Sequence, residues 1–200
     1  MADRIEVYTT VNDTKSEVML NRLKALNFAV NSAKVVEVYT VNKDFKNHEI
    51  EKIAKMLSNP VSQKYLINSH NQESDFDFAL EIGYLPGVTD NIATTAKEGI
   101  EELFKSKFTE EESLHTSTLI FLSGDLNEEI IENIGNAIAN NLIQRIHIKD
   151  HQKFASESGM DTVVPKVKLK AHPSADEVNL NISREELLKL GKEGIPNEDG

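Results

Sequence analysis

Histidines are the first residues in this 200-residue sequence that could do chemistry, because imidazole binds metals and transfers protons near neutral pH. His147 and His151 are four residues apart, a spacing that lets two imidazoles share one ion when both lie on a helix. His147 instead falls in a stretch with strand alternation, where that spacing does not direct both rings to one ion. No cluster of Asp, Glu and His elsewhere has the spacing of metal ligands. We therefore predict no metal site and assign the histidines surface or structural roles.

Paired carboxylates could act as general acid and base if the fold brought them into a cleft. The acidic groups Glu101-Glu102 and Glu110-Glu111-Glu112 fall at exposed positions of a predicted helix or in a loop. They are therefore predicted to be solvated. Lys166, Lys168 and Lys170 alternate with other residues, a pattern typical of an edge strand that lysine protects from further pairing. The sequence thus predicts no catalytic residue in this chain.

The segment from Gly83 to Gly87 leads into a predicted helix, as phosphate-binding loops do. It lacks the lysine and the glycine spacing of a P-loop, and Pro86 removes one N–H donor. A structural turn accounts for every residue, since Pro86 and Gly87 break the strand and Gly87 permits a positive φ. Thr89 or Asp90 can then cap the helix. The predicted site residues are Pro86, Gly87, Thr89 and Asp90. We interpret them as a structural turn; the alternative is that the turn also docks to a partner.

The composition narrows the classes of protein. A formal net charge of −11 argues against nucleic-acid binding, which needs a basic surface to neutralise phosphates. The absence of cysteine excludes disulfides, thiolate metal sites and cysteine nucleophiles. No apolar run reaches the length of a membrane span, and the N-terminus begins with strand alternation instead of an apolar signal region. We therefore expect a cytoplasmic protein without nucleic-acid or membrane partners, in which 39% hydrophobic residues suffice for a core.

The first third of the chain alternates predicted strands and helices. Capping-box spacing from Thr14 to Glu17 predicts the start of the first helix. Asn59-Pro60 is predicted to end the second helix, because Asn tolerates the left-handed cap and Pro cannot continue a helix. The predicted buried side of the first helix is Val18, Met19, Leu23 and Leu26. The predicted order is a strand around 5–7, a helix from 14, a strand over 36–41, a helix over 50–57 and a strand over 64–67.

The same order recurs in the second third of the chain. Aligning Ile67 with Ile148 gives an offset of 81 residues, which holds without a gap back to Asp44 and Asp125. The first strands align at the smaller offset of 75, which pairs Val7 with Ile82. The second copy therefore has six more residues than the first, and we expect these around 109–113. The identical pairs are Asp44/Asp125, Ile50/Ile131, Glu51/Glu132, Ile53/Ile134, Asn59/Asn140, Gln63/Gln144 and Ile67/Ile148. The sequence therefore predicts a tandem duplication, too short for a solenoid, whose copies pack against each other.

The elements of the second copy follow from the same patterns. A strand over 80–84 precedes a helix whose predicted buried stripe is Ile92, Ala96, Ile100 and Leu103. Cap spacing from Asp125 to Glu128 predicts a further helix with Ile130, Ile131, Ile134 and Ile138 inside. Beyond it we expect a linker over 156–160 with Gly159, a strand over 163–169, and a short helix. That helix would begin at Asn181 or Ser183 and carry Leu187, Leu188 and Leu190.

These elements give an α+β fold. The predicted domains are a first repeat over 1–70 and a second over 76–155, each with the order strand-helix-strand-helix-strand, and a linker segment over 156–200. Two equal units can bury each other's apolar faces about a pseudo-two-fold axis, as the subunits of a homodimer do. We therefore expect a pseudo-dimer within one chain, and a monomer in solution.

Several tracts in the same order resemble one enzyme family. The segment Ala79–Phe104 (ALEIGYLPGVTDNIATTAKEGIEELF) resembles the N-terminal region of the large form of phosphoribosylformylglycinamidine synthase. The small PurS-type subunit of the split enzyme has the same Pro-Gly-Val-x-Asp turn before its first helix. The tracts Gln144–Ile148 and Val163–Leu169 resemble the same region of the large enzyme. The resemblance covers nearly the whole chain and implies PurS-like repeats.

The resemblance implies a part in an ATP- and glutamine-dependent ligase of purine biosynthesis, with ATP and Mg in the full-length enzyme and no cofactor in this chain. The family's Trp-Ser-Glu-His-Cys signature is missing, because the chain has neither Trp nor Cys. Synthetase and glutaminase chemistry would therefore lie outside these residues, and the synthetase and glutaminase domains would be the partners of a non-catalytic N-terminal part. The alternative is a stand-alone regulatory module of ACT-like build that binds a small metabolite between its repeats.

Overall fold

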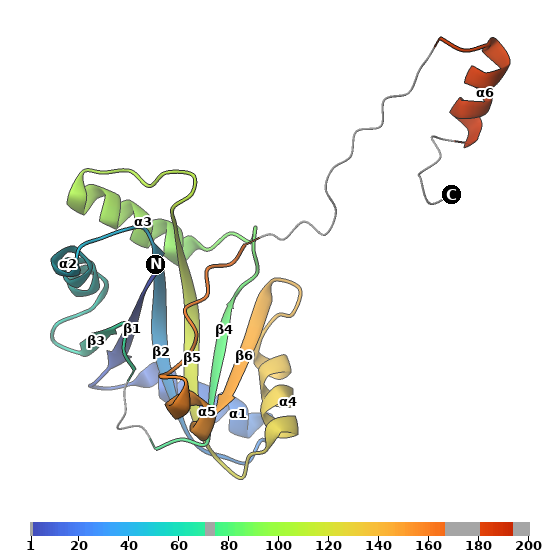
Figure 1. Ribbon diagram of the computed structural model, residues 1–200. Coiled ribbons are helices and arrows are strands. Elements are labelled where there is room, and N and C mark those ends of the chain that lie inside the picture. The colour runs from blue at the N-terminus through green and yellow to red at the C-terminus, as the bar shows by residue number, and fades with distance from the viewer. Residues whose placement is uncertain (1, 71–74, 167–180, 194–200) are drawn as a thin grey trace. The chain divides into compact units, whose positions relative to one another are not determined.

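The computed structural model describes residues 2–70, 75–166 and 181–193. The chain divides into two compact units, residues 1–167 and 168–200, and each unit is described by itself. Figure 1 shows the elements of the first unit. In chain order they are β1 (Asp3–Thr9), α1 (Thr14–Ala25), β2 (Val30–Asn42), α2 (Asn47–Leu57), β3 (Gln63–Ile67), β4 (Phe78–Tyr84), α3 (Asn91–Phe104), β5 (Ser113–Gly124), α4 (Glu128–Ile138), β6 (Gln144–Asp150) and α5 (His151–Ser156).

The strands form one six-stranded antiparallel sheet in the order β3-β1-β2-β5-β4-β6. β2 and β5 lie at the centre and pair from Val30 opposite Gly124 to Asn42 opposite Ser113. The first half of the chain supplies β3, β1 and β2, and the second half supplies β5, β4 and β6 in the reverse order. The fold is therefore mixed α and β with a single sheet that both halves build, as the α+β class predicted.

Four helices cover one face of the sheet, and the two halves of the chain exchange helices there. α3 comes from the second half, yet its Ile100 lies in one cluster with Ile5 of β1 and Ile53 of α2. α1 comes from the first half, yet its Leu23 lies with Ile134 of α4 in the cluster that covers β4. Each half therefore completes its apolar core with a helix that the other half supplies.

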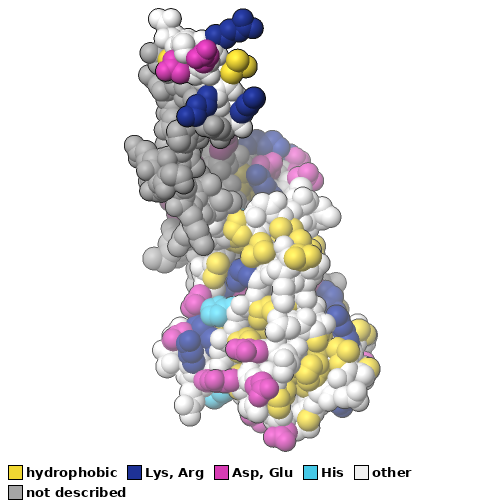
Figure 2. Space-filling view, turned by 90° about the vertical axis from the view of Figure 1, so that its right-hand side faces the viewer, with side chains coloured by type: hydrophobic (Ala, Val, Ile, Leu, Met, Phe, Trp, Pro, Cys, Tyr) yellow, Lys and Arg dark blue, Asp and Glu magenta, His cyan; other side chains and the backbone are white. Residues whose placement is uncertain are grey.

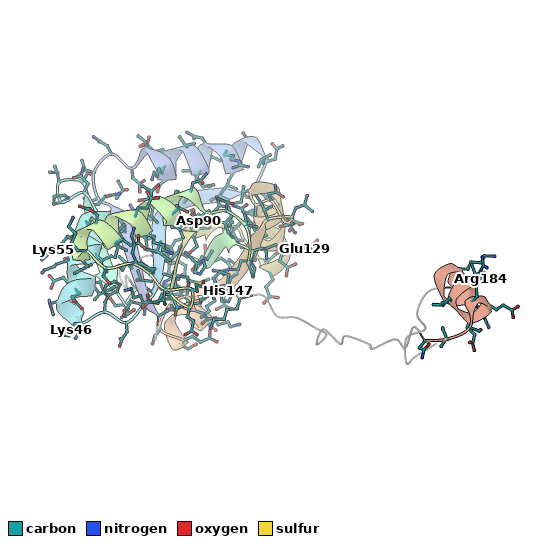
Figure 3. All side chains as sticks on the ribbon, turned by 90° about the horizontal axis from the view of Figure 1, so that it is seen from above. Lys46, Lys55, Asp90, Glu129, His147 and Arg184 are labelled. Atoms are coloured by element: carbon teal, nitrogen blue, oxygen red, sulfur yellow. The ribbon has the colours of Figure 1, made fainter. Side chains whose placement is uncertain are left out.

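α5 and the segment after it cover the opposite face of the sheet (Figures 1 and 3). Phe154 of α5 lies 5.1 Å from Phe76 and 5.4 Å from Phe121, measured between ring centroids. Met160 completes this cluster. The sequence did not predict α5, because six residues are too few to show helical periodicity.

The first helix begins at Thr14 as predicted, but its capping residue and its buried side differ from the prediction. Its N-cap is Asp13, which accepts a hydrogen bond from the N–H of Ser16, so the predicted Thr14 capping box was wrong. Leu23 is fully buried, whereas Val18 is 66% exposed and Leu26 is 45% exposed. At about 100° per residue, Val18 lies about 140° around the helix from Leu23, so the two cannot face one core.

Two further helices also begin or face differently from their predictions. In α3 the buried residues are Ala93, Ala96 and Ile100, while Ile92 and Leu103 are 59% and 45% exposed. The prediction was wrong for Ile92 and Leu103, because at about 100° per residue they lie about 100° and 80° around the helix from Ala93, at the edge of the buried side. In α4 the cap is Asn127, whose side chain accepts from the N–H of Ile130, and not Asp125.

The last predicted strand is wrong for residues 163–166, which have no regular secondary structure, and residues 167–169 lie outside the described part. Lys166 is exposed, and Lys168 and Lys170 also lie outside it.

The second unit contains α6 (Arg184–Glu193). Ser183 and Glu186 hydrogen-bond each other's backbone N–H groups at its start, which confirms the predicted beginning of this helix at Ser183. No helix in the described residues is long and apolar enough to cross a membrane.

Candidate functional site

The predicted turn between β4 and α3 has the conformation that its residues require. The N–H of Val88 donates to the carbonyl of Leu85 at 3.3 Å, which closes a four-residue turn. Gly87 occupies the third position with a φ of +83°, and Pro86 occupies the second, as in a type II turn. A Cβ at Gly87 would meet no atom within 4 Å. The backbone conformation, and not packing, therefore requires glycine here.

Asp90 holds the turn to two elements at once (Figure 3). One carboxylate oxygen accepts from the N–H of Ala93 at 2.9 Å and caps α3. The other accepts from both the N–H and the hydroxyl of Thr116 on β5, each at 2.8 Å. Thr89 is exposed and is not the cap. The second contact could not be predicted from local patterns, because Thr116 is 26 residues away.

Asp90→Ala should lower the free energy of unfolding by about 2 kcal/mol, because it removes a helix cap and leaves the Thr116 N–H without its acceptor. Asp90→Asn keeps an oxygen for the cap and should cost about half as much. Urea denaturation of both variants measures the difference. Equal losses for the two variants would contradict the assignment of separate roles to the two carboxylate oxygens.

The first half of the chain has a shorter version of this turn. Asn12 adopts a φ of +50° and is followed by Asp13, the cap of α1. Asp13 follows Val7 by six positions, whereas Asp90 follows Ile82 by eight. Two of the six extra residues of the second half therefore lie in the Pro-Gly turn, and the prediction that all six lie around 109–113 was wrong.

The turns after α2 and α4 form the same hydrogen bonds in both halves. Asn59 donates its N–H to the side chain of Gln63 at 2.7 Å, and Asn140 donates to Gln144 at 2.8 Å. The side chains of the two asparagines accept from the N–H groups two residues later, at 2.9 and 3.1 Å.

The second of these donors, Leu142, is 87% exposed. Figure 2 shows hydrophobic side chains gathered on the side of the molecule that carries α4 and β6.

A buried group of charges lies on the sheet face opposite the four helices. Arg4 donates to Glu6 at 2.7 Å and to Glu81 at 2.8 Å, and all three side chains are at most 5% exposed. Tyr8 donates its hydroxyl to Glu6 at 2.5 Å, and Ser117 donates to Glu81 at 2.6 Å. Burial alone would lower the pKa of Arg4, but Glu81 and Glu6 raise it above its usual value. This ion group therefore joins β1 to β4 and the first half to the second.

Lys149 anchors the segment after α5 to the same face. Its fully buried ammonium donates to the carbonyl of Gly159 at 2.8 Å and to the carboxylate of Asp161 at 2.9 Å, and pairs with Glu157 at 2.7 Å. A carboxylate partner also lies near His147, whose Nε2 is 3.6 Å from Asp161. The segment 157–161 is thus held by charge as well as by the aromatic cluster.

Arg145 has no such set of partners. Its nearest carboxylate oxygen belongs to Glu81, 4.0 Å from Nη2, and its buried Nε has no hydrogen-bond partner. The guanidinium lies against Gly83, where a Cβ would be 2.9 Å from Nη2. Burial lowers the pKa of Arg145, and Arg4 lowers it further, while Glu81 acts in the opposite direction.

The histidines and carboxylates singled out from the sequence lie apart. His147 is on the sheet face, and His151 begins α5 and contacts the ring of Phe76 at 5.0 Å. Glu101 was predicted to be solvated, but it accepts from the N–H of Phe108 at 2.9 Å and pairs with Lys107. No group of three or more His, Cys, Asp or Glu in the described residues could hold a metal ion.

Two half-buried histidines should make stability depend on pH. Burial lowers the pKa of His115 and of His147, so the folded state favours their neutral forms. As pH falls below the unfolded value of about 6.5, the unfolded chain binds more protons and stability is lost. Asp90 and Arg145 act on His115; Asp161, Lys149, Glu81 and Arg145 act on His147.

We therefore expect the free energy of unfolding to fall between about pH 7 and pH 5. A His115→Gln, His147→Gln double variant should flatten this dependence, whereas His48→Gln, at an exposed position of α2, should not. Guanidinium denaturation across the pH series measures it. Stability that stays level over this window in the parent protein would contradict the expectation.

A groove of about 310 Å³ opens beside the buried ion group, next to the end of β3. Its lining includes Arg4, Glu6, Asn68, His70 and Met160. Arg4 and Glu6 already pair with each other, and Asp3, which also lines the groove, accepts a hydrogen bond from Asn68. On β5 the hydroxyl of Ser113 lies 3.0 Å from Nε2 of His115 and within hydrogen-bond distance of it. No protein-family model and no curated protein matches this chain.

Proposed function

We propose that this chain is the non-catalytic N-terminal part of phosphoribosylformylglycinamidine synthase. That ligase converts formylglycinamide ribonucleotide to formylglycinamidine ribonucleotide with ATP and with ammonia from glutamine. In this proposal the chain consists of two PurS-like repeats that form a pseudo-dimer, and it helps to join glutaminase to synthetase. It binds no cofactor of its own, while ATP and Mg belong to the remaining parts of the enzyme.

The observation that carries the proposal is the repeated architecture together with the Pro-Gly turn. The strand order reads the same from either edge when the two halves are interchanged. The turns at Asn59 and Asn140, which align at the offset of 81, form matching hydrogen bonds. The turn with Pro86 and Gly87 occurs before α3 and supports the resemblance to the PurS-type subunit.

The isolated chain should neither hydrolyse ATP nor release ammonia from glutamine. It has no cysteine, which glutaminases of this family use as the nucleophile, and no P-loop spacing. Coupled assays for ADP and for ammonia, with enzyme-free blanks, measure both reactions. Turnover of either substrate that increases with protein concentration and survives repurification would contradict the proposal.

The sequence that the gene encodes around this region tests the identity directly. A segment with the Trp-Ser-Glu-His-Cys signature in the same reading frame would support the synthase. A stop codon directly after Gly200 would favour the ACT-like module instead. In the first case, a gene with this region deleted should fail to restore growth of a purine auxotroph that lacks the enzyme, while the intact gene restores it.

A further inference from the structure

Arg145 is a partly buried cation whose nearest carboxylate, that of Glu81, lies 4.0 Å away and forms no hydrogen bond with it. Its side chain is 21% exposed, and no hydrogen bond joins its guanidinium to any residue that the structure describes. Nε alone is buried without a partner, so the two Nη atoms remain in contact with solvent. A guanidinium offers five N–H donors, and a buried donor without a partner is commonly explained by an ordered water or a bound ion.

The nearest carboxylate is already in use. Glu81 accepts from Arg4 through both oxygens, at 2.8 and 3.3 Å, and from the hydroxyl of Ser117 at 2.6 Å. Its distance of 4.0 Å from Arg145 is too long for a hydrogen bond. The carboxylate of Asp161, on the same face, accepts from Lys149. Glu81 therefore acts on Arg145 at ion-pair distance, but no described carboxylate hydrogen-bonds its guanidinium.

The corresponding place in the first half of the chain is filled. At the offset of 81, Arg145 corresponds to Lys64, and at the offset of 75, Gly83 corresponds to Tyr8. The ammonium of Lys64 lies over the ring of Tyr8, 5.8 Å from its centroid. In the second half the ring is replaced by Gly83, whose missing side chain leaves room for the guanidinium. The same position therefore holds a cation in both halves. In the first half the cation is covered by an aromatic ring, and in the second half no ring in the described residues covers it.

We propose that Arg145 binds an oxyanion, a carboxylate or a phosphate group, on the sheet face between β4 and β6. The two Nη atoms that reach solvent present the fork that matches two oxygens of such a group. His147, two positions along β6, is 29% exposed on its side chain and lines the same face. In a chain of net charge −11, a guanidinium here with N–H donors left over attracts an anion that most of the surface repels.

Inorganic phosphate and glutarate are the probes, each titrated into the ¹⁵N-labelled full chain at constant ionic strength. The Nε–H signal of Arg145 and the amide of Gly83 should shift saturably in the millimolar range. Arg145→Gln should weaken binding about tenfold or more, measured on the Gly83 amide. Gly83→Tyr keeps Arg145 but places a ring beside it, as Tyr8 lies beside Lys64 in the first half. This variant should weaken binding as much as Arg145→Gln does. Gly83→Ala serves if the tyrosine variant does not fold.

Lys64→Gln and Arg22→Gln are the matched controls, and each should change affinity less than twofold. Saturation with phosphate alone assigns the site to a phosphate group, and saturation with glutarate alone assigns it to a carboxylate, as on a partner's side chain. Absence of saturable shifts with both probes would overturn the proposal. So would an equal loss in Arg22→Gln, since binding would then reflect general surface charge. None of these outcomes depends on the proposed synthase function.

Discussion

Glu81→Ala should lower the free energy of unfolding by about 3–5 kcal/mol, the largest effect we expect from one substitution in this chain. The reason is what remains behind, since Arg4 is buried and loses its strongest carboxylate, and Ser117 loses its acceptor. Arg4 keeps only Glu6, and removing one carboxylate from a buried ion group costs far more than the loss of an exposed contact. Urea denaturation with an unchanged m-value measures the effect.

Two variants serve as comparisons for Glu81→Ala. Glu37 pairs with Lys15 at the surface, with side chains 33% and 59% exposed, so Glu37→Ala should cost at most about 1 kcal/mol. Lys149→Met should cost less than Glu81→Ala, because the carboxylates it leaves, Glu157 and Asp161, are 44% and 57% exposed. A loss below about 1 kcal/mol for Glu81→Ala would contradict the view that its ion group is buried and coupled.

The fragment 1–70 alone should not form a folded monomer, although it contains one complete predicted repeat. Its cluster around Ile5 and Ile53 lacks the residues of α3 that cover it, among them Ala96 and Ile100. β2 also loses β5, its partner along nearly its whole length. We expect the fragment to be unfolded at low concentration, or folded only when a second copy supplies the missing helix and strand.

Circular dichroism melts and amide spectra, read together with sedimentation, measure the state of this fragment. The control is the fragment 1–166, which retains both halves and should melt in one cooperative step as a monomer. A monomeric 1–70 with dispersed amide signals and a cooperative melt would contradict the exchange of helices as a stabilising feature.

The elements that could be predicted are those for which periodicity and breakers agree. α4 is an example, because Ile131 and Ile134 repeat at helical spacing and both are fully buried. The turn at Pro86 and Gly87 is another, since proline and glycine each allow few alternatives there. The buried side of α1 was predicted only in part, because its apolar residues do not all lie on one side: Met19 and Leu23 pack in the core, while Val18 and Leu26 are exposed.

The buried ion group could not be predicted from alternation. Arg4, Glu6 and Glu81 alternate with apolar residues along their strands, which is the pattern of a sheet with one face in water. They are buried because residues from α5 onward pack against that face, more than 60 positions after Glu81 in the sequence. Such burial depends on tertiary contacts that local patterns do not encode. The second contact of Asp90, to Thr116, has the same cause.

The central pairing of β2 with β5 has a consequence for the nascent chain. After β2 leaves the ribosome, about 70 residues must follow before β5 begins, which takes roughly 4 to 14 seconds at about 5–20 residues per second. During that time one edge of β2, with Val35, Val36, Val38 and Val41, has no strand to pair with. Such an apolar edge is a template for pairing between chains. Chaperone demand during synthesis should therefore peak before β5 emerges, and should depend on how fast this interval is translated.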